Sequence, residues 1–382
     1  KFQILKKIIL FFFVSLLMQI SCKPETDKIA ERNAVIDSTI TSFQKNLLKT
    51  ELDSVISSRK FNGSISVRQN GNLIYDRDNG FENFKLKKNL DSNSVFAIGS
   101  VSKQFTAVQI LLLEKAGKLS TKDLVSKYLP EFQKEGFKNI TVDHLLSHRS
   151  GISDFAPNLA SKPDTEFSYS NKGFRYLGKI IEEVSGRSYA ENAKELFAKA
   201  GMTHTFTADS YEAAHNFAGA NLGNDTQNNI VENMPKRLAV DDISVPAGGI
   251  LSTVDDLHRW NDALYNGKIL NSATLQKMLT KHSERPHYIL GKVGYGYGIM
   301  MNLKAPTAYF HSGYVKGSPS LVVYYPNSKT SVVILSNIAD ESKGKEGFFI
   351  PHQRVKETID LVENSVEAVR KEMYKPTARL AE

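Results

Sequence analysis

Residues 96–107 read FAIGSVSKQFTA, and they place a serine and a lysine where a loop is predicted to become a helix. The next residues, QILLLEKAGKL (109–119), continue an apolar pattern at helical spacing and reach a helix stop at Gly117. Ser100 would then lie at or near the first turn, beside unpaired N–H groups, with Lys103 one turn further on the same face. Such a position stabilises a developing anion, and it equally suits an ordinary N-cap serine. The local pattern does not distinguish these two roles, so residues elsewhere in the chain must be considered.

The overall composition is that of a globular protein. The chain has 382 residues, of which 41% are hydrophobic and 24% charged, and this length allows a substantial core. The net charge is +8, but charges of both signs are interleaved, without a basic tract or an aromatic RNA-binding motif. This pattern argues against nucleic acid as a partner.

The N-terminal residues 1–21 have the features of a signal peptide. A basic start precedes an apolar run from Ile8 to about Ile20, which is short for a membrane span. Cys22 follows, and because it is the only cysteine it cannot form an internal disulfide. Its position resembles the lipidation box of bacterial lipoproteins, which predicts an exported cell-envelope protein anchored to a membrane by a lipid on Cys22. The alternative is an ordinary signal peptide with a chance cysteine. Residues 22–33 are polar and are predicted to be a tether.

Strand patterns occur at both ends of the remaining chain. Residues 63–76, GSISVRQNGNLIYD, alternate around Asn70-Gly71, a strong hairpin signal. Consecutive hairpins predict a mainly antiparallel sheet that the two ends share. Further strands are predicted at 293–302, 307–313, 318–327 and 329–338, and terminal helices at 34–60 and 351–370.

The middle of the chain is mostly helical in pattern, with clear helices at 141–148, 173–186 and 252–267. In the last of these, Ser252 and Asp255 are predicted to form a capping box. We therefore predict one domain over 34–382 of the α/β class, α+β in type, with a mainly antiparallel sheet flanked by helices. Its α/β lobe would comprise about 34–100 and 285–382, an all-helical lobe would comprise about 101–284, and the site would lie in the cleft between them.

Two further stretches carry polar groups that can complete a site. FSYSNKGF (167–174) contains Tyr169-Ser170-Asn171, and AYFHSGYVKGSPS (308–320) contains His311-Ser312-Gly313 on a predicted strand. The order Ser-x-x-Lys, Tyr-x-Asn, then a basic residue-x-Gly resembles the serine hydrolase family of class C beta-lactamases, DD-peptidases and related esterases. The resemblance runs from about residue 61 to 337 and includes LLSHRSGI and PAGGILSTVDDL.

The resemblance implies a beta-lactamase/DD-peptidase-like fold that needs neither a metal nor an organic cofactor. Ser100 would be the catalytic nucleophile, and Lys103 or Tyr169 would be its base, because burial lowers the pKa of a lysine and a nearby cation lowers that of a tyrosine. Asn171 would hold Lys103 and contact the substrate amide. The backbone N–H groups of Ser100 and Tyr314 would form the oxyanion hole.

The strand motif would bind the substrate. Gly313 would leave room for the substrate beside the strand, next to Ser312 and His311. Beta-lactamases of the family usually carry lysine at the position of His311, whereas several peptidases and esterases carry histidine, which is mostly neutral at pH 7. The resemblance thus implies a DD-carboxypeptidase, D-peptidase or esterase that acts on a small-molecule or peptide substrate, such as a peptidoglycan stem peptide or an ester. The alternatives are a beta-lactam hydrolase and a non-hydrolytic penicillin-binding sensor of the same fold.

A metal site is the remaining alternative. His144 and His148 are four residues apart on a predicted helix, a spacing that metals can use. The sequence offers no obvious third ligand, so a metallohydrolase is the weaker hypothesis.

Overall fold

The computed structural model describes residues 24–58, 61–212, 216–223, 228–230, 244–287 and 289–373. The predicted signal peptide and Cys22 lie outside these residues. The chain forms two compact units, one from its two ends, up to Val55 and from Arg354, and one from residues 56–353. The division of the predicted domain into lobes stays a prediction.

The unit made from the chain ends contains most of two long helices, α2 (Glu25–Ser58) and α12 (Ile350–Met373). The Arg370 guanidinium of α12 lies 3.3 Å from the Asp37 carboxylate of α2, and this ion pair joins the two helices. The helix predicted at 351–370 is therefore confirmed.

Helix α2 begins earlier than predicted, and most of the segment predicted as a tether is helical. The reason lies in its first turn. The carbonyl of Pro24 accepts hydrogen bonds from the N–H groups of Asp27 and Lys28. Glu25 and Asp27 also place negative charge at the positive end of the helix dipole.

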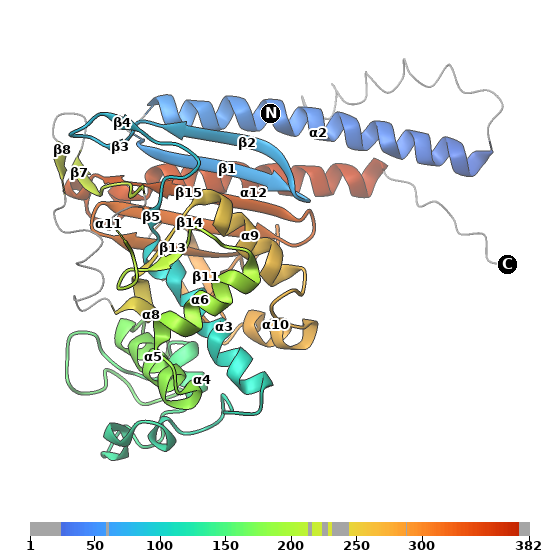
Figure 1. The fold of residues 1–382 in the computed structure, drawn as a ribbon. Helices are drawn as coiled ribbons and strands as arrows, with labels where there is room; N and C mark the ends of the chain where they lie inside the picture. The colour runs from blue at the N-terminus through green and yellow to red at the C-terminus, as the bar shows by residue number, and fades with distance from the viewer. Residues whose placement is uncertain are drawn as a thin grey trace. The chain divides into compact units, whose positions relative to one another are not determined.

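The larger unit is built on an eight-stranded sheet with the order β10-β11-β12-β13-β14-β15-β1-β2. Figure 1 labels β1, β2, β11, β13, β14 and β15 of this sheet. Every neighbouring pair is antiparallel. Ile65 of β1 lies opposite Ile334 of β15, so the early hairpin and the late strands share one sheet, as predicted. The strands are β1 (Gly63–Gln69), β2 (Asn72–Asn79), β10 (Ser283–His287), β11 (Gly291–Tyr295), β12 (Met300–Met301), β13 (Tyr309–Val315), β14 (Ser318–Tyr325) and β15 (Thr330–Ser336).

Between β2 and β10 the described residues include helices and short strands, and the three helices predicted most clearly are present as α4, α5 and α9. The described helices there are α3 (Ser102–Lys115), α4 (Val142–Leu146), α5 (Asn171–Ser185), α6 (Tyr189–Ala200), α8 (Val245–Gly248), α9 (Val254–Tyr265) and α10 (Ser272–Leu279), and a 3₁₀ turn, η2 (Gly99–Val101), precedes α3. The short strands are β3 (Phe81–Asn83), β4 (Lys88–Asn89), β5 (Phe96–Ala97), β6 (Phe206–Thr207), β7 (Asn221–Gly223), β8 (Asn228–Ile230) and β9 (Ile250–Ser252); β16 (Ile338–Ala339) and α11 (Gly344–Phe348) follow β15. No described helix combines the length and the apolarity that a membrane span requires.

The predicted capping box of α9 is wrong by one residue. The N-cap is Thr253, whose side chain accepts a hydrogen bond from the N–H of Asp256.

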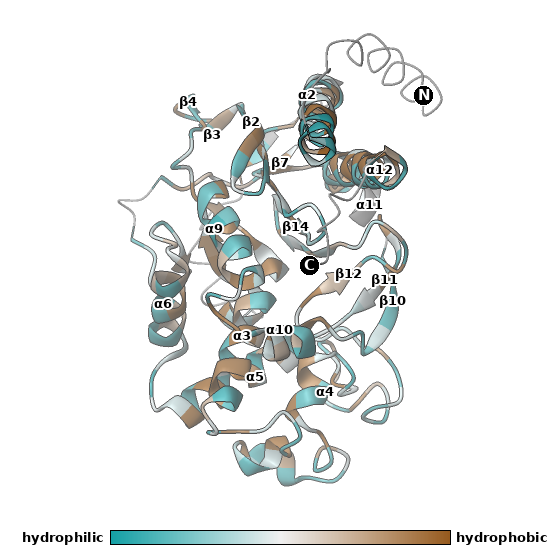
Figure 2. Cartoon of the chain, turned by 90° about the vertical axis from the view of Figure 1, so that its right-hand side faces the viewer, coloured by the Kyte–Doolittle hydropathy of each residue, from teal (hydrophilic) through white to brown (hydrophobic). Residues whose placement is uncertain are grey.

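Helices α9 and α10 both contain hydrophilic and hydrophobic residues interspersed along their length, which is typical of helices with one buried face (Figure 2).

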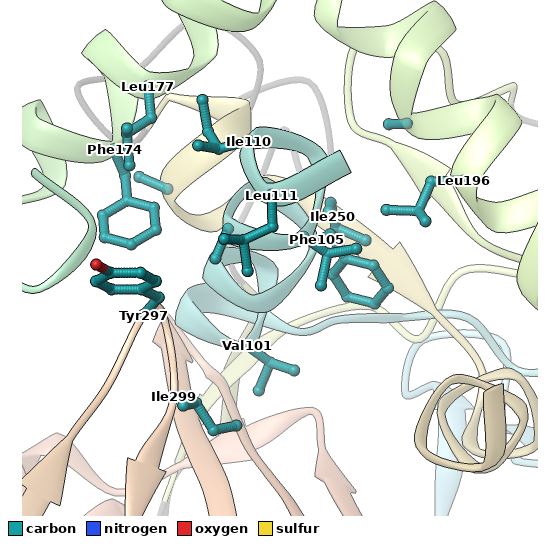
Figure 3. Packing of buried hydrophobic residues seen from close by; sticks show 14 of the residues in the cluster. Val101, Phe105, Ile110, Leu111, Phe174, Leu177, Leu196, Ile250, Tyr297 and Ile299 are labelled. Carbon is teal, nitrogen blue, oxygen red and sulfur yellow. The ribbon is translucent and has the colours of Figure 1, made fainter. Parts of the chain in front are cut away.

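Helix α3 runs through an extensive cluster of buried apolar residues (Figure 3). Its residues from Ser102 to Leu111 are all buried, so this part of the helix is enclosed on every side. Phe105 packs against Trp260 of α9 and Phe197 of α6, with ring centroids 4.2 and 5.4 Å apart. Helix α3 is thus a rigid support for the residues at its start.

Candidate active site

The residues around the start of α3 bring three reactive side chains together. Ser100 lies in turn η2, and Lys103 lies one turn further on in α3, as the spacing predicted. The Lys103 Nζ is 3.1 Å from the Ser100 Oγ, and the Tyr169 hydroxyl donates to the same Oγ at 2.8 Å. Ser100 and Tyr169 are half-buried, whereas Lys103 is fully buried. Ser100 is therefore accessible to a ligand while its potential base is shielded from water.

Burial changes the acid–base chemistry of Lys103. It lowers the pKa of Lys103 from its ordinary 10.5 to about 7, and the nearby Arg285 cation acts in the same direction, while the Asp154 carboxylate opposes them. Besides Ser100, the Nζ has two partners, the Asn171 Oδ1 at 2.8 Å and the Ala247 carbonyl oxygen at 2.6 Å. The amine can therefore exist uncharged near neutral pH.

The two oxygen partners also fix the direction of the Lys103 lone pair. A carbonyl oxygen can only accept, so Asn171 and Ala247 each require an N–H of the lysine. A neutral amine has two N–H bonds and one lone pair. When both N–H bonds are directed to these oxygens, the lone pair is left facing the Ser100 Oγ. This arrangement can remove the proton of a serine hydroxyl.

Asp154 is a site residue that the sequence prediction did not include. Its carboxylate accepts four hydrogen bonds: from the Asn171 N–H and Nδ2, both 2.9 Å, from the Lys172 N–H at 2.9 Å and from the Ser170 Oγ at 3.1 Å. It therefore joins the loop after Ile152 to the N-terminus of α5. The sequence signal is only an acidic residue in a loop.

The two histidines considered for a metal do not lie on one helix face. Helix α4 ends at Leu146, and His148 has a φ of 55°, outside the helix. The Nδ1 of His144 accepts from the Thr141 N–H, and the Nδ1 of His148 accepts from the Ser170 N–H, both at 3.2 Å. Among the described residues no group of three or more His, Cys, Asp or Glu side chains could hold a metal ion.

His311 lies on β13 and is fully buried. Its Nδ1 is 2.7 Å from the Ser312 carbonyl oxygen, so that nitrogen carries the proton, and its Nε2, 3.1 Å from the Tyr295 hydroxyl, accepts. Burial and the nearby Lys103 keep the pKa of His311 well below its ordinary value. His311 is therefore a neutral group held by the protein, and it does not present a cation to a substrate. The Ser312 Oγ is engaged as well, 3.0 Å from the Nε2 of His287.

A cation does lie beside the site, on strand β10. The Arg285 guanidinium carbon is 5.0 Å from the centre of the Tyr169 ring and 5.2 Å from that of Phe167. In the sequence, residues 281–292 have no clear strand pattern. In the structure they form most of the β10–β11 hairpin, which positions Arg285 at the site.

Strand β13 approaches the turn that contains Ser100 very closely. A Cβ on Gly313 would be 2.0 Å from the Ile98 carbonyl oxygen, and one on Gly99, whose φ is +50°, would be 2.7 Å from the Tyr314 nitrogen. The backbone N–H of Tyr314 is thus next to the residue that precedes Ser100. Glycine at 313 is required by the protein's own backbone, a reason that the sequence prediction did not include.

Comparison with known proteins agrees with this geometry. Residues 43–349 match the family model described as Beta-lactamase. Penicillin-binding protein 4* of Bacillus subtilis (strain 168) is 27% identical over 336 residues, which cover 78% of this chain and 72% of that protein. Teichoic acid D-alanine hydrolase of Staphylococcus aureus is 31% identical over 159 residues, covering 37% of this chain and 40% of that protein. The crystal structure of D-amino acid amidase from Ochrobactrum anthropi SV3 has a TM-score of 0.70 at 20% identity, covering 85% of this chain and 99% of that one, a likeness of fold.

Proposed function

The chain belongs to the Beta-lactamase family of serine hydrolases, and on that premise we propose that it hydrolyses peptide or ester bonds of D-amino acids through an acyl-enzyme on Ser100. The observation that carries this proposal is the contact of one half-buried serine hydroxyl with both a buried lysine and a tyrosine hydroxyl. Serine is a weak nucleophile at its free pKa and needs such a base.

In the proposed reaction the Ser100 Oγ attacks the substrate carbonyl carbon while its proton passes to the Lys103 Nζ. The tetrahedral intermediate collapses, the bond to the leaving amine or alcohol breaks, and that group receives the proton from Lys103. Water then attacks the ester carbon while Lys103 accepts the proton of the water. The bond from that carbon to the Ser100 Oγ breaks, the Oγ recovers the proton from Lys103, and the acid product leaves. The Tyr169 hydroxyl donates to the Oγ and orients it. The lone-pair direction of Lys103 favours it over Tyr169 as the base.

The developing oxyanion would be bound by the backbone N–H groups of Ser100 and Tyr314. The support is the close approach of β13 to turn η2 at Gly99. The Tyr314 side chain is itself held, because its ring stacks on Phe348 with centroids 3.8 Å apart and its hydroxyl donates to Glu341. One such donor typically contributes about 3–4 kcal/mol to stabilising the transition state.

Two lines of support bear on the substrate. Relatives and structural neighbours carry the names penicillin-binding protein, teichoic acid D-alanine hydrolase and D-amino acid amidase, which share a D-residue or its mimic. The neutral, fully engaged His311 does not supply a fixed cation for a substrate carboxylate. A carboxylate would instead meet Arg285 beside Tyr169. We propose a D-peptidase or D-aminoacyl esterase and regard beta-lactam hydrolysis as the weaker alternative.

The test is intact-protein mass spectrometry after incubation with a fluorescent penicillin and, separately, with a fluorophosphonate. Ser100→Ala is the matched variant, because it removes only the hydroxyl. We expect both probes to add one label to the natural protein and none to the variant. Hydrolysis of D-alanyl-D-alanine peptides and of D-alanyl esters is then compared directly. Labelling of Ser100→Ala at the natural rate would overturn the nucleophile assignment.

The pattern of labels also separates the alternatives. Labelling by fluorophosphonate alone would favour an ester or D-amide substrate. A penicilloyl adduct that never turns over, without hydrolysis of any peptide or ester, would favour a penicillin-binding sensor of the same fold.

A further inference from the structure

We propose that Asp154 is a positioning residue that directs the Lys103 lone pair toward Ser100 through the Asn171 side chain. The inference rests on the proposed role of Ser100. It gives a function to the loop after Ile152. Neither the sequence nor the comparisons assigned a residue of this loop to the site.

The first step is the orientation of the Asn171 amide. The Nδ2 of Asn171 donates to the Asp154 Oδ2 at 2.9 Å. Because a carboxylate can only accept, the amide nitrogen must face Asp154 and the Oδ1 must face the other way. The Oδ1 is then the atom 2.8 Å from the Lys103 Nζ. Without the carboxylate, the amide could rotate and present its NH₂ to the lysine.

The second step links that orientation to reactivity. An amide nitrogen facing Lys103 would be a donor, and a neutral amine can meet a donor only with its lone pair. The lone pair would then be directed at Asn171, and the Ser100 hydroxyl would lose its proton acceptor. Asp154 thus determines, through Asn171, whether the lone pair of Lys103 faces Ser100 or Asn171.

The third step is electrostatic. The groups that face Lys103 are Asp154 from the loop, Arg285 from β10, Tyr169 before α5, His148 after α4 and His311 from β13. Burial holds the pKa of both histidines well below 6.5, so the two histidines are neutral. The Asp154 carboxylate therefore opposes burial and Arg285, and it raises the pKa of Lys103. Loss of its charge should move the titration of Lys103 to lower pH.

A purely structural role as the helix cap of α5 is the competing explanation. Asp154 does accept from the first N–H groups of α5, where the helix dipole favours an anion. The N-cap hydroxyl, however, belongs to Ser170, whose Oγ accepts from the Gly173 N–H at 3.0 Å. The two roles can be separated because Ser170→Ala removes the cap and the 3.1 Å bond from the Ser170 Oγ to the Asp154 Oδ1, but keeps both bonds from Asn171 to the Asp154 Oδ2.

The experiment measures the second-order rate of Ser100 labelling by a fluorophosphonate from pH 5.5 to 9. It compares the natural protein with Asp154→Asn, Ser170→Ala and Asp164→Asn. Asp164 is the matched control, because it is in the same loop but its carboxylate pairs with Arg149. We expect Asp154→Asn to lower the rate by about tenfold to a hundredfold at pH 7.5, as for lost charged hydrogen bonds. In the pH–rate profile of Asp154→Asn, the rise controlled by Lys103 should shift to lower pH by up to about one unit.

The controls distinguish the possible failures. Ser170→Ala and Asp164→Asn should lower the melting temperature at most and keep the natural pH profile. A natural rate and profile for Asp154→Asn, or an equal shift in Asp164→Asn, would overturn the inference, whereas labelling of Ser100→Ala would overturn the proposed function instead. If Asp154→Asn does not fold, Asp154→Glu replaces it. That variant keeps the charge on a longer side chain. A reduced labelling rate with an unshifted pH–rate profile would support the positioning role, and a natural labelling rate would overturn it.

Discussion

At the scale of single residues, reactivity depends on the charge state of Lys103. Burial lowers the pKa of Lys103 to about 7, so its free-amine form becomes the major one above that pH. We expect the rate of Ser100 labelling to rise from pH 6 to 8 and then level off. Lys103→Arg should reduce labelling by roughly 10²–10⁴-fold at every pH, because a guanidinium stays protonated and cannot accept the serine proton.

The control for this prediction is Lys115→Arg in the last turn of the same helix, where the lysine is exposed. It should label at the natural rate throughout. A pH-independent rate in the natural protein, or substantial labelling of Lys103→Arg, would contradict Lys103 as the base and would favour Tyr169.

At the scale of secondary-structure elements, the packing of β13 against turn η2 decides whether an oxyanion hole can form. A Cβ on Gly313 would lie 2.0 Å from the Ile98 carbonyl oxygen and 2.5 Å from the Ser320 Oγ, so β13 must move away. We expect Gly313→Ala to cost about 1–3 kcal/mol of unfolding free energy. It should also abolish most Ser100 labelling, because the Tyr314 N–H moves with the strand.

Gly219→Ala is the matched glycine control for that experiment. A Cβ at Gly219 would have one neighbour, the Glu82 carbonyl oxygen at 3.7 Å, an ordinary contact. Thermal unfolding and labelling of this variant should be near natural. If Gly313→Ala is destabilised but labels normally, the two N–H groups do not form the proposed hole.

The elements were predictable where the sequence has a local period or a turn signal. The hairpin at Asn70-Gly71 is an example, since both residues have positive φ, 49° and 78°, as a type I′ turn requires. Spacing also predicted Ser100 and Lys103 on one face. Helix ends were less accurate, because caps such as Thr253 depend on single side-chain hydrogen bonds.

The parts of the site that could not be predicted depend on contacts between distant segments. Asp154 lies in a loop without periodicity, and its role is set by the approach of that loop to α5. Arg285 lies in a stretch that has no clear strand pattern, because β10 is a polar strand at the end of the sheet. The sequence indicated a neutral His311, but its burial follows only from β13 and Tyr295 in three dimensions.

At the scale of the whole molecule, the site has to be brought to its substrate. Residues 1–21 and Cys22 lie outside the described residues, so export and anchoring rest on the sequence pattern. We propose that the chain is an exported lipoprotein of the cell envelope. The name of one relative, teichoic acid D-alanine hydrolase, refers to a polymer of that compartment.

Replacement of Cys22 tests this proposal. We expect the natural protein to fractionate with membranes and to incorporate a labelled fatty acid, because a diacyl anchor buries enough methylene groups for stable attachment. Cys22→Ser keeps the size and polarity of the side chain but has no thiol to accept a lipid, so it should appear in the soluble envelope fraction, still labelled at Ser100. Ser100→Ala is the fractionation control and should stay with the membranes. Retention of Cys22→Ser in the membrane fraction would contradict the lipid anchor, and since the chain has no second cysteine, no other thiol could substitute for it.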